Sequence, residues 1–212
     1  FEFVLQQANT PYFIWMAHDD LRDTLYLETL VEILEANPAS AMAFGNLENT
    51  DPSGTVVRRF ESFARFSQPS ALRRIWRFLW EKEYLGKANP IYSLYRTEFA
   101  KSLWSHFPLN SHWGADMNFV LSALARTNIL ISPDVTLRKE LSPVTNDALV
   151  EQHKVPRGEF PLRLYREYFR DIRSALQGTG LAIPGLAIMY VRFFSLLVHV
   201  TLKHVKLSLR SL

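Results

Sequence analysis

The stretch from Tyr12 to Asp20 constrains the fold most, because an apolar run leads directly into two neighbouring carboxylates. Residues 12–16 suit a buried strand, and an apolar run bounded by polar residues is typical of a central strand in a parallel sheet. In open α/β sheets, ligands gather just past the carboxyl ends of such strands. The sequence therefore predicts an α/β fold with Asp19 and Asp20 at a ligand-binding edge.

Two interpretations of these acids remain open. Asp19 and Asp20 could hold a hard divalent cation, which prefers oxygen ligands and shares them with phosphate. Alternatively, they cap the helix that follows or are solvated loop residues. We interpret the neighbouring His18 as a pocket wall or hydrogen-bond donor, because no second ligand stands four residues away on a helix, as a zinc site of that kind needs.

Composition limits the class of protein. The 212 residues are 48% hydrophobic and 21% charged, which suits a globular chain with a real core. Because there is no cysteine, a disulfide framework and a thiolate metal site are excluded. The formal net charge of +3 is mild.

A basic helix predicted over residues 69–84 raises the question of nucleic-acid binding. Its apolar residues have the spacing of a core-facing stripe, and its arginines fall on the opposite, solvated side, so we predict no nucleic-acid partner. The inward set is Leu72, Ile75, Trp76 and Leu79, and the outward set is Arg73, Arg74 and Arg77.

Other elements are predicted from apolar runs and turn formers. They are a helix from Asp23 or Thr24 to about Ala36 that ends at Asn37-Pro38, a strand over 41–44, a hairpin strand over 55–60, a strand over 90–96, and two strands over 128–131 and 135–138 separated by Pro133-Asp134.

Asp116 follows a polar loop, Asn110–Ala115, and begins a helix. The partial positive charge of a helix N-terminus favours an ionised carboxylate. Asp116 could therefore be a helix cap, or equally a base that removes a proton from a hydroxyl. His112 in the loop could line the same site.

The chain ends in a basic tail. Arg192 and His199 interrupt the apolar run Leu181–Leu202, which argues against a membrane span. Polar residues recur every three or four positions, which predicts an amphipathic helix lying in a membrane interface. The main alternative is an amphipathic helix that packs on the domain or on a second copy of the chain. A membrane-spanning helix is a minor alternative. The polar stripe is Arg192, Ser195, His199, Lys203, Lys206 and Arg210.

Several motifs in order resemble family 2 glycosyltransferases of the GT-A fold. The first is Ala8–Asp20, where the family has a strand that ends in an acidic metal-binding motif. Tyr26–Glu28 and Asn37-Pro38 follow, where the family has a helix that closes near an Asn-Pro. Leu94–Glu98 is similar to the family's strand-to-helix step beside the acceptor site, and Trp113–Asp116 resembles the place of its catalytic base.

The resemblance covers roughly residues 1–145 and implies a partial GT-A fold with a mixed central sheet, followed by C-terminal amphipathic helices. It divides the chain into residues 1–147, the acceptor and metal side of a GT-A domain, and residues 148–212, a basic helical tail. It further implies an N-terminally truncated fragment, because the family's opening strands, which hold the nucleotide, have no counterpart here.

By resemblance, Asp19 is the metal-binding acid, supported by Asp20, and the metal is Mg or Mn. Asp116 is the general base of an inverting transfer from a nucleotide-sugar donor. His18 and Arg138 would contact the donor, although Arg138 could equally make a plain surface salt bridge.

One departure from the motif is that Ala17 stands where the family has its first acid. We expect the parent protein to be an enzyme and this piece alone to bind its donor weakly. The implied acceptor is a sugar or a lipid-linked sugar in cell-surface polysaccharide or glycolipid synthesis, at the cytoplasmic face of the cell membrane. The alternative is a non-catalytic, membrane-associated relative that acts as an interaction domain.

Overall fold

The computed structural model describes residues 2–60, 62–82, 85–106, 114–140 and 162–195. The strands are β1 (Tyr12–Phe13), β2 (Asp20–Arg22), β3 (Met42–Thr50), β4 (Val56–Phe60), β5 (Leu94–Arg96) and β6 (Ile129–Glu140). The helices are α1 (Glu2–Gln7), α2 (Tyr26–Ala36), α3 (Ala71–Trp80), α4 (Thr97–His106), α5 (Ala115–Arg126), α7 (Leu162–Ala175) and a last helix over residues 182–195, with 3-10 turns η1 (Ser62–Phe66) and η3 (Asn89–Tyr92).

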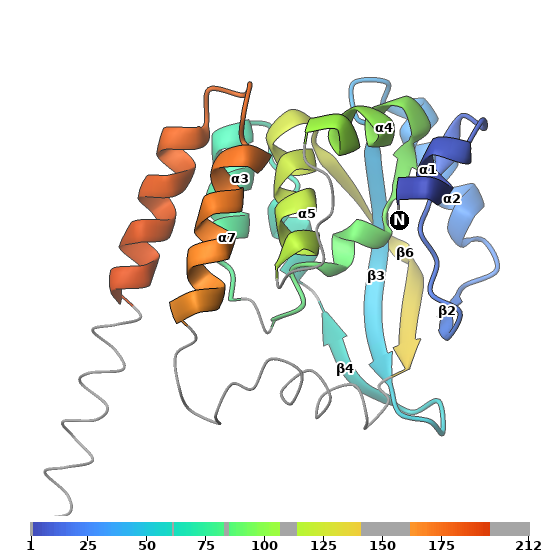
Figure 1. The fold of residues 1–212 in the computed structure, drawn as a ribbon. Helices are drawn as coiled ribbons and strands as arrows, with labels where there is room; N and C mark the ends of the chain where they lie inside the picture. Colours follow the sequence, from blue (N-terminus) through green and yellow to red (C-terminus); the bar gives the residue numbers. More distant parts are fainter. Residues whose placement is uncertain (1, 61, 83–84, 107–113, 141–161, 196–212) are drawn as a thin grey trace, which may run out of the picture.

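The strands form one mixed sheet in the order β1-β5-β3-β6-β2, and β4 pairs with β3 as the predicted hairpin. The central pair β3 and β6 is parallel and the other pairs are antiparallel, which confirms the predicted mixed sheet. Helix α2 lies on one side of the sheet, and α3 and α5 lie on the other, with α7 and the last helix stacked outside them (Figure 1).

The prediction of a central parallel strand over residues 12–16 is wrong. Strand β1 has two residues, stands at the end of the strand order and runs antiparallel to β5. It stops early because the backbone carbonyl of Trp15 accepts a hydrogen bond from the Arg22 guanidinium, 3.0 Å away. The Trp15 ring packs edge-on against Phe13 and Phe119, inside the core.

The two strands predicted over 128–131 and 135–138 form a single strand, β6. The sequence between them is accommodated by a bulge, because the pairing with β3 shifts between Phe44 and Asn46. The Asn46 side-chain amide donates to the Pro133 carbonyl across this bulge, at 2.7 Å. Gly45 lies there, and a Cβ atom at this position would be 2.5 Å from the Val135 carbonyl oxygen.

Helix α3 is rotated relative to the prediction. Arg74 is buried, whereas Leu72 and Trp76, both predicted to face inward, are exposed. The reason is that the Arg74 guanidinium donates to three backbone carbonyls, which offset the cost of burying its charge. The acceptors are the carbonyls of Gln68, Pro69 and Leu124.

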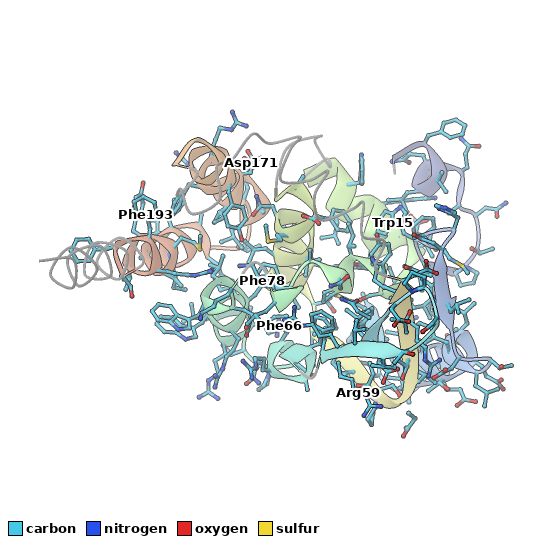
Figure 2. All side chains as sticks on the ribbon, turned by 90° about the horizontal axis from the view of Figure 1, so that it is seen from below. Trp15, Arg59, Phe66, Phe78, Asp171 and Phe193 are labelled. Atoms are coloured by element: carbon cyan, nitrogen blue, oxygen red, sulfur yellow. The ribbon has the colours of Figure 1, made fainter. Side chains whose placement is uncertain are left out.

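One aromatic residue of α3, Phe78, is buried. Phe78 packs against Phe66 with ring centroids 5.4 Å apart, and both rings lie in the interior between α3 and the sheet (Figure 2).

The described part of the predicted tail packs on the domain. Arg126, at the end of α5, donates to the carbonyls of Ala175 and Gln177 at 2.9 and 2.7 Å, which ties α7 to α5. Arg192 is buried and donates to the Leu79 carbonyl, so it does not belong to an exposed basic stripe. In the described residues, no helix is long and apolar enough to cross a membrane. The boundary at 147/148, and the stripe beyond residue 195, fall outside the described residues.

Candidate functional site

Asp20 is the first residue of β2 and lies directly opposite Lys139 of β6. Its side chain is 2% exposed, and the Lys139 ammonium is 3.9 Å from its Oδ2, which accepts no hydrogen bond from the described residues. Burial raises the pKa of Asp20, and the charge of Asp19 raises it further. The charges of Lys139, Arg22 and His18 partly oppose this rise.

Asp19 and His18 precede this strand in an exposed turn. The Asp19 side chain is 52% exposed and that of His18 is 98% exposed, and the His18 Nδ1 lies 4.0 Å from the Asp19 Oδ1. Asp19 is therefore accessible to a ligand from solvent, while Asp20 behind it is fixed by strand pairing.

Asp116 lies in the first turn of α5, just after Gly114, whose φ of +84° is the left-handed conformation that glycine adopts readily. Its carboxylate accepts a hydrogen bond from the Met117 N–H at 2.7 Å. Although the residue is exposed at the surface, the protein around its carboxyl displaces water, and this burial raises the pKa. The predicted preference for the ionised form is thus outweighed, even though the Met117 N–H and Lys139 lower the pKa in part.

Lys139 connects the two acids. Its ammonium lies beside Asp20 of β2. Its charge also lowers the pKa of Asp116 on α5, nearly a hundred residues after Asp20 in the chain. The ammonium stands 4.1 Å from the centre of the Tyr92 ring in η3, a cation–π contact that holds it in place. The structure therefore shows Lys139 in contact with Asp20, and its charge also reaches Asp116.

Arg138 is not part of this group. Successive residues of a strand face opposite sides of the sheet, so Arg138 points away from Lys139. It pairs with Asp23 and with Glu48, the latter at 3.3 Å, and these partners raise the pKa of Arg138 while the pKa of Asp23 is lowered. The salt-bridge alternative for Arg138 is the one its contacts favour.

Sequence reasoning missed two cations near the acids, Lys139 and Arg22. Arg22 stands two residues after Asp20 in the same strand, and therefore on the same side of the sheet, a spacing that the sequence does contain. Lys139 could not be found in this way, because no local pattern reveals that β6 pairs with β2. His112 and the loop around it lie outside the described residues.

The donor set fits a divalent cation in part. Asp19 and Asp20 repel each other, and the buried oxygen of Asp20 lacks a hydrogen-bond donor in the described structure, so a cation here would relieve both costs. Magnesium is commonly held by one or two carboxylates together with phosphate oxygens and water. Within the described ranges, no group of three or more acidic, histidine or cysteine side chains could hold a metal by itself.

Replacing Lys139 by methionine is expected to raise the pKa of both Asp20 and Asp116, because a positive charge that favours their ionised forms is removed. Carboxyl ¹³C NMR titration would measure both values. Lys101→Met is the matched control, since Lys101 interacts with Glu98 on α4. Unchanged pKa values in Lys139→Met would show that the ammonium does not connect the two acids.

Comparisons with known proteins give one fold-level result. No family model matches the sequence, and no curated protein matches it. The crystal structure of S. aureus TarS residues 1–349 in complex with UDP is similar, with a TM-score of 0.55 and 17% sequence identity. The match covers 92% of this chain and 50% of the TarS chain, so this chain spans about half the length of that structure. The chain therefore has the GT-A fold that its motifs predicted.

Proposed function

We propose that this chain provides the metal-binding and acceptor side of an inverting glycosyltransferase. The observation that supports the proposal is that Lys139 contacts Asp20 and that its charge also acts on Asp116, on a fold similar to that of a protein whose structure holds UDP. A nucleotide-sugar donor needs positive charge at its diphosphate, and an acceptor hydroxyl needs a base.

Asp116 acts as the base. Its carboxylate takes the proton of the acceptor hydroxyl while that oxygen forms a bond to the anomeric carbon. The bond between the anomeric carbon and the diphosphate oxygen breaks on the opposite face, and its electron pair leaves with the nucleoside diphosphate. The configuration at the anomeric carbon is inverted in this single displacement.

Asp19 and Asp20 hold the divalent cation, Mg or Mn. When bound, it supplies charge neutralisation to the departing diphosphate. The charge of Lys139 partly offsets the rise that burial causes in the pKa of Asp20, and Arg22 adds positive charge on the same side of the sheet. His18 borders the exposed carboxylate of Asp19 and would contact the donor.

The donor is proposed to be a UDP-sugar, by analogy with the UDP in the TarS structure. The acceptor is a sugar or lipid-linked sugar in cell-surface polysaccharide or glycolipid synthesis at the cytoplasmic membrane face. These finer statements rest on the family resemblance, because a fold does not select a substrate.

Isothermal titration calorimetry of the 212-residue chain with UDP tests the metal-dependent part of this proposal. We expect weak binding, with a dissociation constant of about 1 mM, that requires Mn and disappears in the Asp19→Asn, Asp20→Asn double variant. Asp134→Asn, an exposed acid on the β6 bulge, is the control. Equal UDP binding without Mn and in the double variant would contradict the proposed metal site. Tight binding would contradict the expectation that the donor needs further structure.

The second candidate is a non-catalytic relative that acts as an interaction domain. Ala17 favours it, because the first acid of the metal motif is missing there. Substitution of Asp116 separates the candidates: only the enzyme depends on that carboxylate for its biological activity.

A further inference from the structure

Helix α3 exposes an apolar stripe that the predicted orientation would have buried. Leu72, Trp76 and Trp80 recur every fourth residue and are all exposed, the two tryptophans by 47% and 45%. The rings of Trp76 and Trp80 are stacked, with centroids 5.6 Å apart and an angle of 4° between their planes. Two adjacent exposed indoles are unusual on a protein surface and commonly mark a binding site.

The last helix extends this surface. Its inner side, which includes Ile188, Met189 and Arg192, is buried, and Arg192 reaches the Leu79 carbonyl on α3. Leu72 and Leu79 are seven residues apart and so lie on the same side of α3, which places the exposed stripe beside the last helix. Figures 1 and 2 show this helix at the outer edge of the molecule, next to α7 and α3.

The outward residues of the last helix are apolar as well. Together with the α3 stripe they form what we call the outer face: Leu72, Trp76, Trp80, Ile183, Tyr190, Val191 and Phe194.

The two helices that form the outer face carry no acidic residue. Residues 70–80 and 182–195 contain no aspartate or glutamate, and Glu81, which follows the α3 stripe, and Asp171 on α7 are buried. Arg73 and Arg77 are exposed beside the tryptophans on α3. An apolar face bordered by arginines and free of carboxylates is complementary to a surface that is both apolar and anionic.

We propose that the outer face docks on a lipid bilayer that contains anionic headgroups. The indole rings suit the boundary between acyl chains and headgroups, because each has an apolar body and one N–H donor. Arginine side chains can lie along the same boundary with their guanidinium groups at phosphate level. This inference does not rest on the glycosyltransferase proposal, since it uses neither Asp20 nor Asp116.

Vesicle binding of the 212-residue chain tests the inference directly. We expect co-sedimentation with vesicles of phosphatidylcholine and 30% phosphatidylglycerol, little with pure phosphatidylcholine, and weakening at high salt. With brominated acyl chains, tryptophan emission should be quenched on binding. In Trp76→Phe, Trp80→Phe most of this quenching should disappear while binding remains, because Trp15 and Trp104 are buried.

Two double variants complete the test, one that makes the tryptophan positions polar and one that reverses the charge of the arginines. Trp76→Ser, Trp80→Ser should weaken vesicle binding by about tenfold or more, as should Arg73→Glu, Arg77→Glu. The control is Leu25→Ser, Leu27→Ser, which changes two exposed apolar residues at α2, on the other side of the sheet.

Unchanged binding in the tryptophan or arginine variants, or absence of quenching by brominated lipid, would overturn the inference. Light scattering on the lipid-free chain tests the alternative that a second copy of the chain binds the outer face. A dimer mass that becomes monomeric in Trp76→Ser, Trp80→Ser would assign the outer face to a second copy of the chain and would equally overturn it.

Discussion

If the proposed transferase mechanism holds, replacing Asp116 by asparagine is expected to lower turnover by about 10²–10⁴-fold, the usual loss when a general base is removed. Asparagine keeps the side-chain oxygen that accepts the Met117 N–H, so the start of α5 should be preserved. The amide cannot take a proton from a hydroxyl. Release of nucleoside diphosphate from a panel of UDP-sugars would measure turnover, and circular dichroism would confirm unchanged folding.

The pH dependence gives an independent check. Burial raises the pKa of Asp116, and a base is active only when ionised, so turnover should fall with decreasing pH at a higher pH than for a fully solvated aspartate. Lys139→Met should move this acidic limb to still higher pH. Asp134→Asn should leave rate and profile unchanged. Biological activity that survives Asp116→Asn would favour the non-catalytic interaction domain.

Gly45→Ala is expected to destabilise the fold by about 3 kcal/mol, because a new Cβ would overlap neighbouring atoms in a packed interior. The Cβ would lie 2.5 Å from the Val135 carbonyl oxygen and 2.7 Å from a ring carbon of Tyr26. The backbone carbonyl belongs to the β6 bulge and has little room to move. The substitution would also disturb the hydrogen bond from the Gly45 N–H to the Tyr26 hydroxyl, 3.2 Å long.

Urea unfolding followed by circular dichroism would measure this loss as a lower midpoint at an unchanged slope. Gly54→Ala is the control: its φ is +83° and a Cβ there would touch nothing within 4 Å, so only the conformational cost of about 1 kcal/mol applies. Equal losses at both glycines would show that the bulge can relax around a methyl group.

Local patterns predicted much of this fold correctly. The α2 helix ends at Asn37, the hairpin of β3 and β4 forms, and the helix predicted to begin at Asp116 forms as α5, in which Met117 and Leu124 are buried. In each case one nearby signal decides the outcome: a proline, a turn, or an apolar stripe. The motif order likewise indicated the GT-A fold.

The predictions were wrong where contacts between distant parts of the chain determine the local structure. The burial of Arg74 depends in part on the carbonyl of Leu124, fifty residues away, which accepts a hydrogen bond from its guanidinium, and α3 is rotated away from its apolar pattern. Pro133 remains inside β6 because the pairing with β3 bulges there and the Asn46 side-chain amide donates to its carbonyl. Lys139 joins the site through strand pairing that no local pattern encodes.

The hydrogen bonds from Arg126 to the end of α7 fix the distance between Asp116 and the outer face. If the outer face docks on a membrane, they therefore set how far a substrate must extend from the lipid to reach Asp116. They hold the last helices against α5, so a docked chain would bring Asp116 no nearer to the lipid by swinging on a hinge. Helix α3, which carries part of the outer face, packs directly on α5, so at least one helix-packing distance of about 8–10 Å separates α5 from that face. A lipid-linked acceptor would therefore need a spacer of at least about 10 Å between its acyl chains and its reactive hydroxyl.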